Sequence, residues 1–283
     1  MSLSQASLMD SDPERHEQNM ARWTFAGSLG VVLGPLLLAG LAFAGFSWRG
    51  VFIALAGLSL PVLVFIWKRL PKTPAGVGPL PSLTEVWAGV RGTLAALRGG
   101  EALRWLVLLQ FSDLMLDVLL GFLALYFVDV ARLTAAQAAL GIAVWSGLGL
   151  LGNFQLIPLL EKVGGLETLR VSVLVELLLF PAFLLVASPL VKFVLLGLLG
   201  LFNSGWYAIL KGRLYSSMPG RSGAVMTLDS LFSLLGIILP FGIGLAARFF
   251  GLGAAMWLLL LGPIALLVGL PRNATPAASL TSS

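Results

Sequence analysis

The chain has 283 residues, of which 58% are hydrophobic and only 11% are charged. Water-soluble domains carry about 25% charged residues, so this composition excludes a soluble globular protein and indicates an integral membrane protein. The formal net charge of +5 reflects the loops of such a protein and calls for no nucleic-acid partner. The sequence contains no cysteine, which excludes disulfides and thiol chemistry.

Long uncharged runs recur along the whole chain. Backbone polar groups inside a bilayer must bond within the protein, so these runs are helices or strands of a closed barrel. Their length and their lack of alternating polarity select helices. The predicted fold is therefore an all-α, multi-pass membrane protein. We predict eight transmembrane helices, at Thr24–Phe46, Val51–Trp67, Trp105–Val128, Thr134–Leu160, Val171–Ala187, Phe193–Leu210, Ser222–Ala247 and Leu252–Leu270.

The predicted helices fall into two unequal groups. The first two lie at 23–67 and the other six at 105–271, with a polar arm at 1–22, a linker at 68–104 and a disordered tail at 272–283. The linker opens with the Pro- and Gly-rich stretch KRLPKTPAGVGPLP. Apolar residues then recur at helical spacing, which predicts an amphipathic helix at the membrane surface.

Basic residues predict the orientation of the chain in the membrane. Only four of the 18 Lys and Arg residues fall in connections on one side, namely Arg49, Arg132, Lys192 and Arg248. Cytoplasmic loops are enriched in Lys and Arg, so the other fourteen mark the cytoplasmic side. We therefore expect a plasma (inner) membrane protein with both termini in the cytoplasm.

Ionisable side chains inside a predicted span are the sharpest functional signal. Gln110, Asp113 and Asp117 share one face of the span Trp105–Val128. A charge at the centre of a membrane helix costs at least about 2.5 kcal/mol, so it is retained for a reason. Two carboxylates one turn apart repel each other in a low dielectric, which predicts that one binds a proton, as in a proton carrier. The alternative is a hydrated pair that only holds water or bonds a neighbouring helix.

A second set of candidates lies in the span Phe193–Leu210. Asn203, Trp206 and Tyr207 can contact a polar or aromatic solute. Packing and an interfacial aromatic belt explain Trp206 and Tyr207 equally well.

Other polar residues in the spans are expected to have structural roles. Asn153 and Gln155 are predicted to bond between helices. Glu176 and Asp229 lie near the cytoplasmic ends of their spans. We expect each to pair with a loop arginine, the candidates being Arg170, Arg213 and Arg221.

The sequence shows few features of an enzyme. The one histidine, His16, lies in the polar arm, and no phosphate-binding loop or metal-ligand spacing occurs. We predict no enzyme, no cofactor and no metal. A membrane aspartyl protease or a lipid transferase built on Asp113 and Asp117 would need another carboxylate, and Asp229 is the plausible partner. Repeated polar rings, which a channel requires, are not evident.

The span Thr24–Phe46 is unusually rich in glycine. Gly27, Gly30 and Gly34 lie on one face, where the absence of side chains lets another backbone approach. Pro35 removes a helical hydrogen bond and bends the axis, and Gly40 follows. Such a helix can pack statically or slide against its partner. The first pair of spans also loosely resembles the last pair, with Pro35 matching Pro240.

These features resemble the major facilitator superfamily of secondary transporters. The Gly30-x-x-x-Gly34-Pro35 element is similar to one in the family's fifth helix. Two connections are similar to cytoplasmic loop motifs of the family, one with Glu161, Lys162, Gly164 and Arg170, the other with Lys211, Arg213 and Arg221.

The resemblance implies transport of a small solute by alternating access, coupled to protons through Asp113 and Asp117. It makes these eight spans the last eight of twelve, so the chain is expected to be truncated at its amino terminus or to be a natural short variant. A cavity between two halves of a transporter cannot be enclosed by six helices on one side and two on the other, so a second chain would have to contribute. The alternative is a transport-incompetent remnant or a membrane scaffold.

Overall fold

The computed structural model describes residues 5, 8–10, 12, 15–43, 48–69 and 100–271. Every secondary-structure element within these ranges is helical. The amphipathic helix predicted in the linker and the tail predicted at 272–283 lie outside the described residues.

Six helical stretches among the described residues are long and apolar enough to cross a membrane. Each coincides with one of the six spans predicted after the linker, which confirms a multi-pass helical membrane protein. They are Glu101–Val130, Ala135–Lys162, Gly165–Leu185, Pro189–Ser216, Ser222–Phe250 and Leu252–Gly269.

Several of these stretches are built from more than one helical segment. The first stretch is a continuous helix in which two π-helical turns interrupt the α-helix, and the last contains a 3₁₀ turn. The segments are α5 (Glu101–Ser112), η3 (Leu114–Val118), α6 (Leu119–Leu125), η4 (Tyr126–Val130), α7 (Ala135–Lys162), α8 (Gly165–Leu185), α9 (Pro189–Asn203), α10 (Trp206–Ser216), α11 (Ser222–Gly236), α12 (Ile238–Phe250), α13 (Leu252–Met256), η5 (Trp257–Leu260) and α14 (Leu261–Gly269).

Local sequence signals fix where the helices begin and end. Thr134 and Gln137 form a reciprocal capping box that starts α7. Pro189 occupies the first turn of α9, where its missing N–H costs nothing. Gly251 has a φ of 84° between α12 and α13, a conformation that residues with a Cβ adopt only at a cost.

Lys192 stabilises the end of α8 from within the protein. The predicted position of Lys192 in a connection on the outer side is wrong, because Lys192 belongs to α9 and is 4% exposed. Its Nζ donates to the carbonyl oxygen of Phe183 at 2.6 Å and to Tyr126 Oη at 2.8 Å. The last carbonyl groups of a helix lack partners within the helix, so a buried ammonium there satisfies them.

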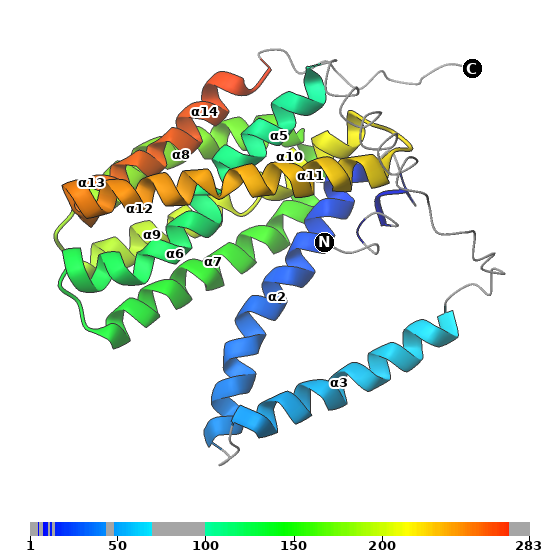
Figure 1. Cartoon of the computed structure of the whole chain (residues 1–283), viewed down its shortest axis with the longest axis horizontal. Helices are drawn as coiled ribbons and strands as arrows, with labels where there is room; N and C mark the ends of the chain where they lie inside the picture. Colours follow the sequence, from blue (N-terminus) through cyan, green and yellow to red (C-terminus); the bar gives the residue numbers. More distant parts are fainter. Residues whose placement is uncertain are drawn as a thin grey trace.

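The two spans predicted before the linker correspond to helices α2 (His16–Phe43) and α3 (Trp48–Arg69). They do not belong to the six membrane-crossing stretches, so their crossing remains a prediction. The beginning of α2 packs on α7 and α10, and α3 packs on α2 and stands apart from the bundle (Figure 1). Large apolar side chains on α3 are exposed, such as Ile53, Phe65 and Trp67.

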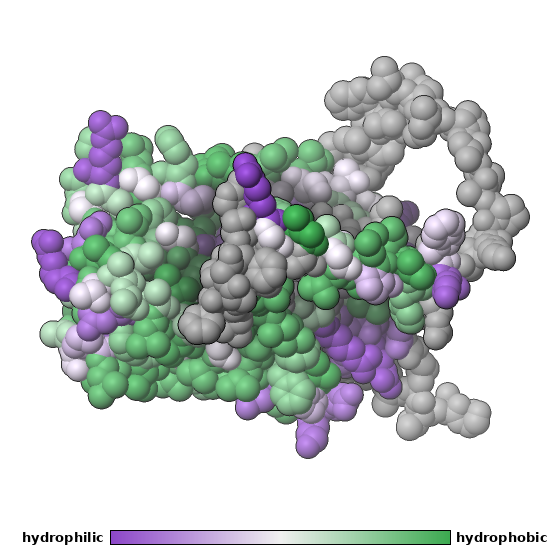
Figure 2. Space-filling view, turned by 90° about the horizontal axis from the view of Figure 1, so that it is seen from below, coloured by the Kyte–Doolittle hydropathy of each residue, from purple (hydrophilic) through white to green (hydrophobic). Residues whose placement is uncertain are grey.

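Apolar side chains form both the core and most of the outer surface. The core holds Phe127, Phe180, Phe183 and Trp206, none of which is exposed. Hydrophobic residues cover most of the visible face of the bundle, and hydrophilic residues gather mainly towards its ends (Figure 2). This surface is the one expected of helices immersed in lipid.

Close packing of α7 against α9 depends on small residues. A methyl group added at Gly152 would meet the Leu201 carbonyl oxygen, and one at Gly200 would meet the Trp145 carbonyl oxygen. Backbones approach this closely only where side chains are absent. This contact fixes two walls of the cavity described below.

Candidate functional site

The predicted acidic stripe faces a cavity of about 540 Å³ inside the molecule. Gln110, Asp113 and Asp117 all line it, from α5 and η3. The other walls come from α2, α7, α9, α10 and α11. The structure therefore brings the three residues of the stripe to one site.

A π-helical turn shapes the wall that carries the carboxyl groups. The backbone N–H of Val118 donates to the Asp113 carbonyl oxygen at 3.0 Å, which widens the turn that contains Asp117. The Met115 carbonyl oxygen accepts a hydrogen bond of 2.9 Å from Asn203 Nδ2 on α9. Such turns often occur at functional sites, because they redirect side chains and release a carbonyl group.

An ion pair lies beside this stripe. Lys211 Nζ on α10 and Asp229 Oδ1 on α11 are 2.5 Å apart, and the two residues are 1% and 8% exposed. Asp113 interacts electrostatically with Asp117, Asp229 and Lys211. Asp113 and Asp117 form no ion pair of their own within the described ranges. The expected loop position of Lys211 is wrong, because α10 continues to Ser216 and buries it.

Helices α2 and α7 form another wall of the cavity, and a hydrogen bond joins them. Asn153 Nδ2 on α7 donates to Ser28 Oγ at 2.9 Å, which confirms the predicted bond between helices. Asn153 is 6% exposed, and its Oδ1 has no hydrogen-bond partner in the part of the chain that the structure describes. Trp23, Thr24, Gly27 and Ser28 of α2 line the cavity as well.

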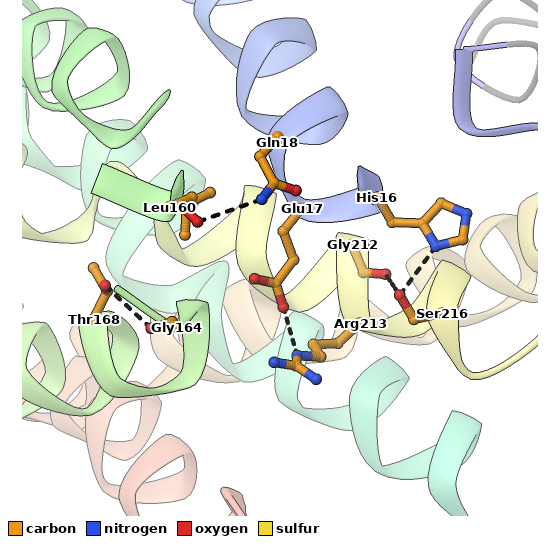
Figure 3. Close-up of polar contacts among 9 residues, drawn as sticks. All are labelled: His16, Glu17, Gln18, Leu160, Gly164, Thr168, Gly212, Arg213 and Ser216. Carbon is orange, nitrogen blue, oxygen red and sulfur yellow. Dashed lines mark hydrogen bonds and ion pairs between the residues drawn. The ribbon is translucent and has the colours of Figure 1, made fainter. Parts of the chain in front are cut away.

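A polar cluster joins the beginning of α2 to α7 and α10 (Figure 3). Glu17 pairs with Arg213 at 2.5 Å, His16 Nδ1 lies 3.0 Å from Ser216 Oγ, and Gln18 Nε2 donates to the Leu160 carbonyl oxygen at 3.3 Å. Gly165 and Gly212 leave space for Glu17, since a methyl group at either would meet it. The cluster lies within two helical turns of Trp23, where the cavity lining begins.

Burial shifts the pKa values of two residues in this cluster, Glu17 and His16. It raises the pKa of Glu17, although the charge of Arg213 acts in the opposite direction. Burial also lowers the pKa of His16, which Met9, Asp10 and Asp12 partly offset. Burial therefore makes the charged form of each group less favourable than it is in water.

The other predicted cavity residues have different surroundings. Asn203 and Tyr207 line the cavity, but Trp206 does not. Trp206 is fully buried and donates from Nε1 to Ser172 Oγ at 2.8 Å. Trp206 therefore packs α10 on α8 and does not belong to the candidate site.

The glycine-rich face of α2 has no close neighbour in the described parts of the chain. A methyl group added at Gly27, Gly30 or Gly34 would meet no atom within 4 Å. The surroundings of Pro35 and Gly40 lie outside what the structure describes. A close partner for this face remains a prediction.

The loop motifs are found at helix ends. Glu161 and Lys162 close α7, Gly164 precedes α8, and Arg170 donates to the Pro271 carbonyl oxygen. Arg221 precedes α11 and is exposed. Arg213 alone among these arginines pairs with a carboxylate.

Glu176 was predicted to pair with a loop arginine, and this is wrong. It is fully buried, and neither carboxylate oxygen has a partner among the described residues. Asp229 pairs with Lys211 on the neighbouring helix and not with one of the predicted arginines.

Sequence reasoning missed His16, Glu17 and Gln18 because it treated residues 1–22 as a solvated arm. Helix-forming residues run without a break from His16 into the apolar stretch, and this continuity was the available signal. Within the described residues, no group of three or more His, Cys, Asp or Glu could hold a metal ion.

Comparison with known proteins now identifies the family. The family model of the Major Facilitator Superfamily matches residues 1–241, which is more than half of the chain. A search of curated proteins finds no match. The family agrees with the six apolar spans and with the cavity that lies between α2 and the bundle. The chain therefore belongs to the Major Facilitator Superfamily, whose members are membrane transporters and not enzymes.

Proposed function

We propose that the chain carries a small solute across the membrane by secondary active transport with alternating access, coupled to protons through Asp113 and Asp117. The observation that carries the proposal is the shared cavity. Gln110, Asp113, Asp117, Asn203 and Tyr207 lie on or between four helical segments, α5, η3, α9 and α10, and line the same space.

The two carboxyl groups supply the coupling chemistry. Two ionised carboxylates near each other in an apolar bundle repel, and a proton bound by one of them relieves that repulsion. Releasing that proton on the other side of the membrane restores the repulsion. A carrier that switches between its inward-open and outward-open states only in defined protonation states couples a proton gradient to solute movement.

The contacts of α2 suit a moving interface. Its beginning is held by few polar contacts, among them Glu17 with Arg213 and His16 with Ser216. Polar contacts of this kind can be exchanged for others when two groups of helices rock against each other. We propose that the face with Gly30 and Gly34, followed by Pro35 and Gly40, slides against another helix in this cycle.

The same proposal includes the placement of the protein. The bias of basic residues supports a plasma (inner) membrane location with both termini cytoplasmic. We propose two working units, residues 23–67 and 105–271, joined by the linker. Asp117 is exposed at the depth of the bilayer core, which supports a second chain that helps to enclose the cavity.

Cysteine labelling tests alternating access directly, because the sequence has no cysteine of its own. Ser146→Cys places a thiol in the cavity wall, and Ser112→Cys places one in the buried core as a matched control. In vesicles, a membrane-impermeant maleimide should label Ser146→Cys from either side and should not label Ser112→Cys. Labelling from a single side under all conditions would favour the transport-incompetent remnant or scaffold.

The same assay tests proton coupling. The ratio of labelling from the two sides cancels the intrinsic reactivity of the thiol when both sides have equal pH. We expect this ratio for Ser146→Cys to change with pH and to lose that change when Asp113→Asn and Asp117→Asn are added. A pH dependence that persists in the combined variant would reject coupling through these carboxyl groups.

A further inference from the structure

The charges in the cavity wall do not balance. Three of the side chains that line the cavity are aspartates, Asp113, Asp117 and Asp229, and none is Lys, Arg or His. Lys211 neutralises Asp229 from outside the lining. Asp113 and Asp117 are left without an ion-pair partner in the described part of the chain. The wall therefore attracts positive charge.

Asn153 supplies an independent indication of a ligand. It is 94% buried and lines the cavity, and its amide nitrogen is engaged with Ser28 while Oδ1 accepts nothing from the described residues. A buried acceptor without a donor costs about 1–3 kcal/mol, so a bound group that donates an N–H would recover this cost.

The hydroxyl groups of the wall also present acceptors. Each of four donates its proton to a nearby backbone carbonyl oxygen at 2.8–3.0 Å and so presents lone pairs, one of which Ser28 already uses to accept from Asn153: Thr24, Ser28, Ser204 and Ser233. An anion needs donors from its site, and the carboxyl groups of this wall repel it. A cation with N–H groups matches this wall.

Aromatic side chains complete the recognition surface. Trp23, Trp145 and Tyr207 line the cavity together with leucine and valine side chains. Aromatic faces attract cations, and a site of a few hundred Å³ with apolar walls accommodates a drug-sized molecule. The indole N–H of Trp145 is buried without an acceptor among the described residues, so it can bind one acceptor atom of the ligand.

We infer that the solute is an organic cation with an ammonium group, which binds at Asp113, Asp117 and Asn153 Oδ1, and an apolar or aromatic body, which lies against Trp23, Trp145 and Tyr207. This inference rests on the proposed transport function, because it names the solute of the same cavity. The ammonium group would take the place of the proton shared by the carboxyl pair.

Equilibrium binding to the purified full chain in lipid nanodiscs tests the inference. Three probes share an indole ring and differ in charge: tryptamine is a cation, tryptophol is neutral and indole-3-propionate is an anion. We expect tryptamine to bind at least about tenfold more tightly than tryptophol, and indole-3-propionate to bind least.

Variants localise the effect to the cavity. Asp113→Asn and Asp117→Asn should each weaken tryptamine binding about tenfold and leave tryptophol binding unchanged. Asp129→Asn is the matched control, because Asp129 belongs to the same span, is exposed and does not line the cavity. It should leave all three probes unaffected.

The outcomes separate the inference from the transport function. Equal binding of tryptamine and tryptophol, no binding of any probe, or unchanged tryptamine binding in both cavity variants would overturn the cation assignment. Two-sided labelling of Ser146→Cys would still support alternating access in those cases. Charge-selective binding together with one-sided labelling would support the cation site and count against transport.

Discussion

Lys211 and Asp229 form a buried ion pair whose loss should be costly. Lys211→Met leaves the Asp229 carboxylate without its cation, and breaking a buried pair from one side costs about 3–5 kcal/mol. We therefore expect a clear drop in the thermal unfolding temperature of the purified protein. Lys211→Met combined with Asp229→Asn should recover most of the loss, because no charge is then left unpaired.

An exposed lysine provides the matched control for this prediction. Lys162 lies at the end of α7 and is exposed, so Lys162→Met should change the unfolding free energy by less than about 0.5 kcal/mol. If Lys162→Met and Lys211→Met lower the unfolding temperature equally, the buried pair does not stabilise the bundle.

Spacing along one helix predicted the cavity residues better than it predicted their partners. Gln110, Asp113 and Asp117 were expected on one face, and they line one cavity because they follow a single helix. Partners across helices depend on how two helices turn towards each other, which no local pattern encodes. For this reason Glu176 was assigned an arginine partner, and none is found for it among the described residues.

The contact of α7 with α9 gives a prediction at the level of the element. Gly152→Ala places a methyl group against the Leu201 carbonyl oxygen and Ser204, and overpacking of this kind costs about 1–3 kcal/mol. Gly147→Ala on the same helix meets nothing within 4 Å, and alanine favours the helix by about 0.5–1 kcal/mol. Thermal unfolding should therefore shift in opposite directions for the two variants. Equal shifts would show that the helices do not approach closely at Gly152.

The number and order of the six later spans were predictable, and their ends were not. An apolar run marks the part of a helix that lies in hydrocarbon, whereas backbone hydrogen bonds continue into polar residues. Accordingly α8 begins at Gly165, before the predicted Val171, and α10 ends at Ser216, after the predicted Leu210. The π-helical turn at Asp117 was not predicted, and it occurs where Asn203 of another helix donates to the Met115 carbonyl oxygen, a contact that no local pattern encodes.

Glycine spacing was a useful signal, but it was applied to only one helix. Gly27, Gly30 and Gly34 of α2 have no neighbour within 4 Å of an added methyl group in the described residues. Gly149 and Gly152 of α7 and Gly200 of α9 have similar spacing and pack against backbone atoms. Glycine spacing indicates that another helix can approach a face closely. Which of the possible faces is approached in this way depends on the fold.

At the scale of the whole molecule, α2 packs on α7 and α10 and thereby forms one wall of the cavity. The polar arm and α2 were predicted separately, yet His16 to Thr24 form one continuous helix whose beginning is anchored by Glu17 and Arg213. The contact joins residues nearly 200 positions apart, so its formation depends on the assembled bundle. A fold whose helices meet through such titratable contacts can respond to pH at that interface.

Acidification should loosen the anchored beginning of α2 through His16. Burial holds the pKa of His16 below its ordinary value of 6.5, so the undocked arm binds more protons than the docked arm when the pH falls below 6.5. The contribution of His16 to docking is therefore complete above pH 6.5 and declines below it. Glu17 acts in the opposite sense: its raised pKa gives a contribution that is lost as the pH rises from 4.5 through the raised value.

Comparison with His16→Asn separates the two groups, because Asn retains a polar atom near Ser216, does not titrate and leaves Glu17 in place. Hydrogen–deuterium exchange of residues 20–23 measures docking, because the first four N–H groups of α2 lack partners within the helix, and the ratio of wild type to variant at each pH cancels the intrinsic exchange rate. Between about pH 5 and pH 8 we expect the protection of the wild type relative to His16→Asn to be constant at the upper end and to fall on acidification. A ratio that stays constant over the whole range, or that rises as the pH falls, would show that the His16 imidazole is not buried against α10, and the anchoring of α2 would then rest on its other contacts, such as Glu17 with Arg213 and Gln18 with Leu160.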